Sequence, residues 1–267
     1  MSFIRPLFEY AAVVWHNTPR HEKYFNDLER LQIDAARTVT GTNRNASKQL
    51  LYSETGWENL SDRREKQRLI LFFKIFNGIA PQHLIDTFMS YNQHTHEHYT
   101  RHQHNKRNIL TRTESFRNSF FPHAIRLWNS LDNTIRNVDS LNIFKSKVDK
   151  LYPRVKKNYY YYFGDRKVNS LLASMRTKCS QLRSDLYANK LTVNDLCSCG
   201  LSETHFHYFF ECMNYIVQRD QLYNDTLFLP RLSLSTVLNG HAECTVQQNM
   251  LMFEAVSRYI YATKRFF

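Results

Sequence analysis

Glycine, cysteine and proline are all scarce in this sequence of 267 residues, which has six glycines, five cysteines and six prolines. So few glycines leave little material for the glycine-rich loops that cradle phosphates, and no P-loop pattern is present. The sequence also lacks a pattern that pairs a nucleophile with its base. We therefore expect that the chain is not an enzyme on its own and has no small-molecule substrate.

Long hydrophobic runs are also missing. The apolar stretches LILFF (69–73) and AAVVW (11–15) are far shorter than the roughly 20 residues needed to cross a bilayer. Arg5 and Glu9 interrupt the N-terminus before the hydrophobic region of a signal peptide can develop. We expect no membrane partner and an intracellular location, nuclear or cytoplasmic, where disulfides are rare and cysteines are better used for metal.

Acidic residues are too few to balance the basic ones. The sequence has 36 Lys and Arg against 24 Asp and Glu, a formal net charge of +12. This surplus favours RNA or DNA as a partner, although a basic surface without such a partner is the alternative. Between 151 and 190, nine basic residues face only Asp165 and Asp185. Because clustered cations attract phosphates, the expected nucleic-acid-binding residues are Arg154, Lys156, Lys157, Arg166, Lys167 and Arg183.

A run of aromatic residues, YYYYF at 159–163, lies within this basic segment. Its rings would be able to stack on unpaired bases. A tyrosine-rich buried or edge strand is the competing interpretation, and the one we favour from the sequence.

Helical periodicity and helix-capping residues dominate the rest of the chain, which predicts a mainly α fold. Helices are expected within 27–41, 61–78, 115–131 and 140–151. Gly41 and Gly78 are placed to end the first two, and Ser140 to cap the last. The three tryptophans, Trp15, Trp57 and Trp128, are expected to anchor cores.

For two of these helices, the sequence predicts which residues lie on a given face. The apolar face of 27–41 is expected to comprise Leu28, Leu31, Ala35 and Val39. The cations of the helix within 61–78 are expected to point outward, either as a solvated face or as a binding surface: Arg63, Arg64, Lys66 and Arg68.

Three of the five cysteines lie close together in LCSCGLSETHFHYFFEC (196–212). The pattern C-x-C-x7-H-x4-C supplies the four soft ligands of a structural zinc site: Cys197, Cys199, His207 and Cys212. Gly200 would let the backbone fold back beneath the two cysteines of a tight turn. Five residues exceed one helical turn by about 140°, so Cys212 must lie where the helix carrying His207 unwinds or bends inward.

Alternatives to this site remain open. His205 is a rival for the imidazole ligand, and the three cysteines would also be compatible with simple burial, which free cysteine favours. Cys179 and Cys244 are expected to be core residues. The histidine-rich stretch HTHEHYTRHQH (94–104) is interpreted as a polar loop, with metal binding as the less favoured alternative.

With these motifs in order, the chain resembles the C-terminal region of reverse transcriptases from non-LTR retrotransposons of the LINE or jockey-like type. The segments that carry the resemblance are IRPLFEYAAVVW (4–15), LERLQIDAARTVTG (28–41), SFRNSFFPHAIRLWNSL (115–131), FKSKV (144–148), LRSDLYANKL (182–191), the cysteine cluster, YIVQRDQL (215–222) and YIYATKRF (259–266). The family's polymerase activity uses a Tyr-x-Asp-Asp turn, and this chain has no Asp-Asp pair. The resemblance therefore implies nucleic-acid handling without catalysis, in a truncated or separately encoded remnant.

The resemblance also implies an organisation in three parts. Residues 1–151 would form a helical thumb-like module, 152–195 a basic connector, and 196–267 a CCHC zinc module with flanking helices. The expected function is to grip RNA or primed DNA, with a palm-bearing reverse transcriptase as a possible partner. The alternative is a domesticated, zinc-stapled scaffold that binds other proteins.

Overall fold

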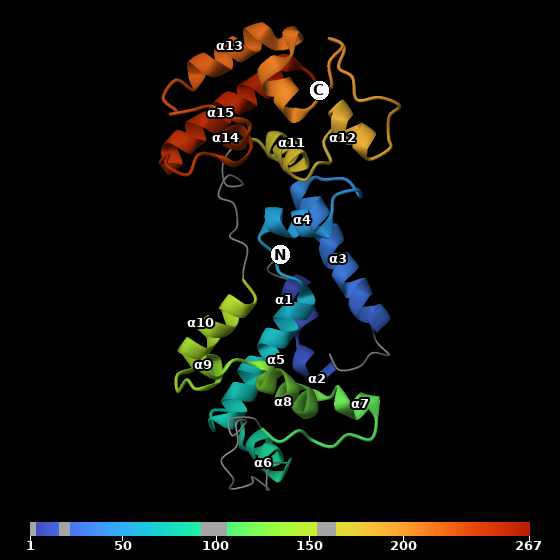
Figure 1. Ribbon diagram of the computed structural model, residues 1–267, viewed down its shortest axis with the longest axis vertical. Coiled ribbons are helices and arrows are strands. Elements are labelled where there is room, and N and C mark those ends of the chain that lie inside the picture. The colour runs from blue at the N-terminus through green and yellow to red at the C-terminus, as the bar shows by residue number, and fades with distance from the viewer. Residues whose placement is uncertain (1–3, 16–21, 92–105, 154–163) are drawn as a thin grey trace. The chain divides into compact units, whose positions relative to one another are not determined.

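The computed structural model describes residues 4–15, 22–91, 106–153 and 164–267, and it is mainly helical (Figure 1). This confirms the fold class predicted from helical periodicity. In these four ranges, pairing between extended segments is limited to an isolated antiparallel bridge between Leu196 and Ser202.

The chain divides into two compact units. The first comprises Met1–Leu31 and Glu58–Arg154, and the second comprises Gln32–Trp57 and Val155–Phe267. Helix α3 (Glu22–Thr40) begins in the first unit and ends in the second. The boundary between Arg154 and Val155 lies three residues from the one expected after residue 151. Residues 32–57, however, belong to the unit that contains the cysteine cluster.

The core of the first unit forms around α5 (Leu60–Phe76), which packs against α6 (Gln82–Tyr91), α8 (Phe120–Ser130) and α10 (Leu141–Leu151). Phe73 of α5 stacks on Phe144 of α10 with ring centroids 4.3 Å apart. Trp128 of α8 is 2% exposed, which confirms it as a core anchor. The shorter helices of this unit are α1 (Ile4–Glu9), α2 (Ala12–Trp15), α7 (Glu114–Arg117) and α9 (Asn133–Arg136).

The expected outward row of cations on α5 is wrong at three of its four positions. Arg64, Lys66 and Arg68 are all buried. The Lys66 ammonium lies 3.1 Å from Glu58, and the Arg64 guanidinium lies 5.1 Å from the ring centroid of Trp15. Because other helices enclose α5 on several sides, its charged positions are covered as well as its apolar ones, and each requires an acid or a ring beside it.

The buried Arg68 contacts His123 of α8. Burial, together with the charges of Arg68 and Arg126, lowers the pKa of His123 to about 4. The imidazole is therefore neutral at pH 7, and its Nδ1 accepts a hydrogen bond from the Arg68 guanidinium. Arg68 therefore belongs to the interior of the first unit and not to a solvated face.

The buried face of α3 also differs from the expected one. Leu31 and Val39 are 55% and 51% exposed, whereas Gln32, Ala36 and Thr40 are buried. Polar residues occupy two of these three buried positions, so a search for apolar periodicity alone selects the neighbouring stripe. The predicted end of the helix is confirmed, because Gly41 follows Thr40 with φ +69°.

The second unit contains α4 (Lys48–Thr55), α11 (Arg166–Arg176), α12 (Arg183–Ala188), α13 (Ile216–Asp225), α14 (Leu234–Asn239) and α15 (Val246–Thr263). Helix α13 runs against α15, as Figure 1 shows. Thr245 and Gln248 form a reciprocal capping box at the start of α15. The core includes Tyr208 and Phe209 from the cysteine segment beside Tyr259 and Ile260 from α15.

A buried ion pair holds 32–57 within this second unit. The Glu54 carboxylate of α4 accepts hydrogen bonds of 2.6–3.0 Å from the Arg176 guanidinium of α11. Arg176 also donates to the backbone carbonyl of Leu238 in α14 at 2.6 Å. Since both charged side chains are at most 7% exposed, this interaction joins three helices in the interior.

We predict that Arg176→Met lowers the free energy of unfolding by about 3–5 kcal/mol, because it leaves a buried carboxylate without its cation. Urea titration followed by circular dichroism measures this loss. The matched control is Arg166→Met, at an exposed position of the same helix, which should change stability by less than about 0.5 kcal/mol. Equal stability of the two variants would contradict the role assigned to the ion pair.

Candidate metal centre

Four side chains with metal-binding atoms converge in the second unit. The ligand atoms of Cys197, Cys199, His207 and Cys212, here called the metal cluster, all lie within 4.8 Å of one another. The Cys197 and Cys212 sulfurs are 3.7 Å apart, and the Cys199 sulfur lies 3.2 Å from Nε2 of His207. These four residues could hold a metal ion.

A tight hairpin presents the first two cysteines. The N–H of Gly200 donates to the carbonyl of Cys197 at 2.9 Å, and the N–H of Cys197 donates to the carbonyl of Leu201 at 2.7 Å. Gly200 adopts φ +93°, a left-handed conformation that residues with a Cβ rarely adopt. The structure therefore confirms the turn beneath the two cysteines.

A widened helical turn presents the other two ligands. Residues His207–Glu211 form a π-helical turn, and the N–H of Cys212 donates to the carbonyl of His207 at 2.8 Å. This i→i+5 hydrogen bond replaces the i→i+4 bond of an α-helix. Because the wider turn takes five residues, Cys212 returns to the side of the helix that carries His207. The predicted unwinding is thus confirmed in a specific form.

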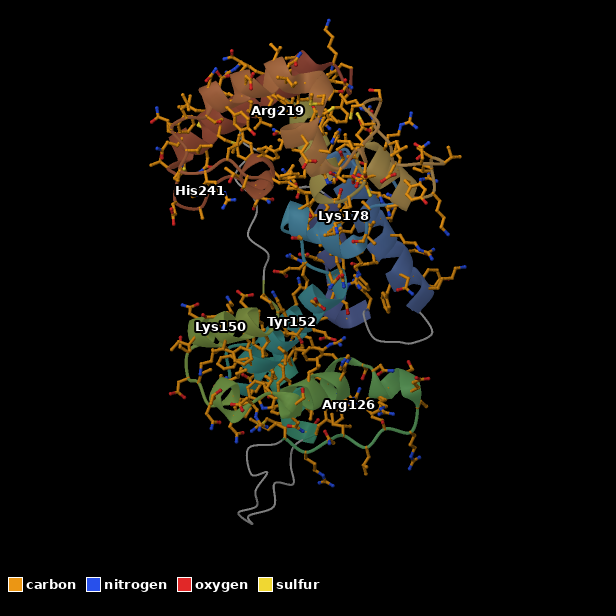
Figure 2. The ribbon with its side chains drawn as sticks, turned by 45° about the horizontal axis from the view of Figure 1, so that its top comes forward. Arg126, Lys150, Tyr152, Lys178, Arg219 and His241 are labelled. Atoms are coloured by element: carbon orange, nitrogen blue, oxygen red, sulfur yellow. The ribbon has the colours of Figure 1, made fainter. Side chains whose placement is uncertain are left out.

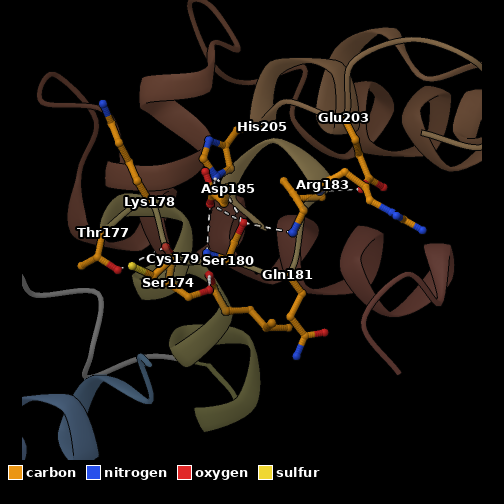
Figure 3. Close-up of polar contacts among 12 residues, drawn as sticks. Ser174, Thr177, Lys178, Cys179, Ser180, Gln181, Arg183, Asp185, Glu203 and His205 are labelled. Atoms are coloured by element: carbon orange, nitrogen blue, oxygen red, sulfur yellow. Dashed lines mark hydrogen bonds and ion pairs between the residues drawn. The ribbon is translucent and has the colours of Figure 1, made fainter. Parts of the chain in front are cut away.

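The two candidate histidines have different surroundings. His207 is 1% exposed and belongs to the metal cluster. His205 turns to Asp185 at the start of α12, with Nε2 3.0 Å from Oδ2 (Figure 3). The Ser180 hydroxyl donates to the same carboxylate oxygen at 2.6 Å. The geometry thus favours His207 as the ligand and gives His205 a structural partner.

Serine, histidine and aspartate meet here, but not in the arrangement of a catalytic triad. In a triad the aspartate and the serine use different ring nitrogens of the histidine. Here Nε2 of His205 faces both the Asp185 carboxylate, at 3.0 Å, and the Ser180 hydroxyl, at 3.4 Å. Burial alone would raise the pKa of Asp185, but hydrogen bonds from His205 and Ser180 lower it below its usual value. The trio is a polar contact that ties His205, two residues before the ligand His207, to α12.

The pKa values of the thiols in the metal cluster shift in different directions. Burial raises the pKa of the Cys212 thiol to about 12, and the neighbouring Cys197 sulfur contributes to the rise. A backbone N–H at Leu201 lowers the pKa of Cys199. Nδ1 of His207 is buried and makes no hydrogen bond within the described residues, since the Glu211 carboxylate lies 3.9 Å away, beyond hydrogen-bond distance.

Sequence reasoning missed the residues that fasten the hairpin. The buried Glu203 carboxylate accepts two hydrogen bonds, at 2.7 and 2.8 Å, from the Arg265 guanidinium, and a third from the N–H of Arg183. The Arg219 guanidinium donates to the carbonyl of Cys212 at 2.9 Å. These partners lie up to 62 residues apart, so local spacing carries no signal for them.

The expected nucleic-acid-binding residues fall into two groups. Arg166 and Lys167, in the first turn of α11, and Arg183, in the first turn of α12, are exposed. Arg154, Lys156, Lys157, the tyrosine run at 159–163 and the histidine-rich stretch at 94–104 lie outside the described residues. Of the remaining cysteines, Cys179 is buried as expected and Cys244 is half-buried against the core.

Comparison with known proteins found no match: no protein-family model, no curated protein and no solved structure is similar to this chain. Among the helices that the structure describes, none is long and apolar enough to span a membrane.

We predict that His207→Ala abolishes stoichiometric metal binding, because it removes one of the four ligand atoms. The measurement is the metal content of the purified protein after dialysis against trace divalent metal. His205→Ala is the matched control, since it removes the same ring two positions away and leaves the metal cluster intact. Retention of metal by His207→Ala together with its loss from His205→Ala would reverse the assignment.

Proposed function

We propose that the metal is zinc and that it holds the fold together. A tetrahedral zinc ion with Zn–S bonds of about 2.3 Å separates two sulfurs by about 3.8 Å, and a sulfur and an imidazole nitrogen by about 3.5 Å. The observed separations of 3.7 and 3.2 Å are close to these values. Three thiolates and one imidazole complete the coordination, so such a site has no position for a reactive water.

We further propose that the chain binds nucleic acid without catalysing a reaction. The observation that carries this proposal is a set of exposed cations on α11, α12 and the turns that follow them: Arg166, Lys167, Lys178, Arg183 and Lys190. Of the two acids of this segment, Asp185 is buried against His205, and Asp165 is exposed and accepts a hydrogen bond from the Tyr261 hydroxyl, so five exposed cations stand against one exposed carboxylate. Such a surface would neutralise phosphates without reading sequence.

The resemblance to the C-terminal region of non-LTR retrotransposon reverse transcriptases supports the same function. Within it, the second unit would grip RNA or primed DNA while a palm-bearing protein supplied the polymerase. Basic side chains also occur elsewhere on the chain, such as Arg126 and Lys150 in the first unit and Arg219 in the second (Figure 2). The proposal assigns the contact to α11, α12 and the turns that follow them because five exposed cations are gathered there.

A protein-binding scaffold is the second candidate. Residues 191–267 contain five Lys and Arg against seven Asp and Glu, so this segment has no positive excess. Apolar side chains such as Val193, Val217 and Leu227 are at least 77% exposed there. Exposed apolar groups of this kind favour contact with another protein.

We predict that the purified protein contains about one equivalent of zinc and that Cys199→Ser loses it. A structural zinc site is worth about 10–16 kcal/mol in small fingers, so the segment from 196 to about 225 should then become sensitive to trypsin. Elemental analysis and limited proteolysis measure the two effects. Cys244→Ser, outside the metal cluster, should retain both zinc and resistance. A metal-free wild-type protein with the same trypsin resistance would contradict a structural role.

We predict that the triple variant Arg166→Glu, Lys167→Glu and Arg183→Glu loses most of its affinity for nucleic acid. Each lost phosphate contact should reduce the slope of log affinity against log salt by about 0.7 for a single strand, or about 2 in total. Fluorescence anisotropy with a labelled RNA hairpin and a single-stranded DNA, at several salt concentrations, measures both quantities.

The matched control for this experiment reverses the same number of charges in the first unit, at the exposed Arg107, Arg112 and Lys150. It should retain most of the affinity if α11 and α12 form the interface. Equal losses in the two triple variants would show that net charge alone drives binding. Absence of salt-dependent binding by the wild-type protein would instead favour the scaffold.

A further inference from the structure

A cavity of about 610 Å³ lies in the second unit beside the first turns of α11, and here it is called the α11 pocket. The residues that matter for its chemistry are Asn43, Arg166, Lys167, Gln181, Phe266 and Phe267, all of which line it. Its size is that of cavities that bind small ligands, about 300–1,000 Å³. The lining combines cations, one acid, side-chain amides and aromatic rings.

The aromatic side of the α11 pocket is prearranged. Phe267 stacks on Tyr261 of α15 with ring centroids 4.8 Å apart and an angle of 15° between the rings. Phe267 nevertheless remains 55% exposed as a residue. Phe266 is fixed from behind, since its ring packs edge-on against the buried Tyr208 at 5.3 Å. A planar ligand can therefore stack on a surface that is already ordered, at little cost in side-chain entropy.

The polar side of the α11 pocket carries two cations and one acid, Asp165. Arg166 and Lys167 are both exposed there. The acid beside them, Asp165, accepts a hydrogen bond from the Tyr261 hydroxyl. Asn43 also lines the pocket, and its side-chain amide donates to the carbonyl of Cys179 at 3.3 Å and accepts from the N–H of Asn45 at 3.0 Å. Amides such as those of Asn43 and Gln181 match the hydrogen-bonding edges of bases, and the two cations match a phosphate.

We propose that the α11 pocket binds one unpaired nucleotide of a single-stranded nucleic acid, with the base stacked on Phe267 and its phosphate facing Arg166 and Lys167. This inference rests on the proposed nucleic-acid binding and deepens it, because it assigns a base-stacking site rather than phosphate contacts alone. Stacking accepts any base, so the site would favour unpaired over paired strands without strong sequence preference.

The test compares two probes on the full-length, zinc-loaded protein: a fluorescent oligouridylate and an abasic strand of the same length. Phe267→Ala should weaken binding of the oligouridylate by about 5- to 150-fold, the range that base stacking supplies, and leave binding of the abasic strand unchanged. Lys167→Gln should weaken both and reduce the salt slope by about 0.7. Tyr187→Ala, at a ring that is 53% exposed and outside the pocket, should change neither.

Three further outcomes of this experiment would decide against one or both proposals. If the wild-type protein binds the oligouridylate and Phe267→Ala binds it equally well, the α11 pocket is not a base site and the proposed function stands. If the wild-type protein binds neither strand, both proposals fall. If uridine monophosphate displaces the strand when it is added at a concentration equal to that of the protein, the pocket binds a free nucleotide. The assignment of the pocket to a strand is then overturned.

Crosslinking of a 4-thiouridine strand to the wild-type protein gives a measurement that needs no variant. A crosslinked peptide containing 261–267 supports the α11 pocket. Crosslinks confined to other peptides of the protein oppose it, whatever the stability of Phe267→Ala.

Discussion

The π-helical turn from His207 to Cys212 is the constraint on which the second unit depends, because one turn serves two purposes. His207 and Cys212, at the two ends of the turn, belong to the metal cluster, and Tyr208 and Phe209 between them are part of the core. The Tyr208 hydroxyl is hydrogen-bonded to Thr263, and its carbonyl accepts from the Tyr259 hydroxyl, so both ends of this residue are tied to α15. A metal ion that fixes the turn therefore also fixes the packing of α15.

The formal charge of the chain is a poor guide to its surface. Arg64, Lys66 and Arg68 add three charges to the first unit but lie inside it, against acids, rings and an imidazole. Arg176 likewise belongs to the interior. Once such residues are set aside, the cations that can reach a polyanion are fewer than the sequence suggests, and their placement on α11 and α12 matters more than their number.

Local patterns predicted the local part of the candidate site, and their failures have a common cause. The turn at Gly200 and the unwinding before Cys212 follow from spacing alone, since both concern residues within one or two turns of each other. The choice between His205 and His207 does not, because Asp185, twenty residues earlier, captures His205. Nor does the place of 32–57 in the second unit, which rests on a contact between Glu54 and Arg176, 122 residues apart. Pairings across such distances leave no periodic signal in one sequence.

Helix α11 connects the two proposals through its opposite sides. Val168, Leu172 and Met175 bury one side in the core that also receives Tyr208, whereas Arg166 and Lys167 stand exposed at its first turn. A ligand that contacts the exposed side would bind only where the buried side is packed, and under the proposed function that packing would depend on the turn that a bound metal fixes. By linkage, a strand that binds the folded unit would raise its apparent stability. Under the proposed function, a structural metal would thus contribute to binding without touching the ligand, by keeping α11 in place.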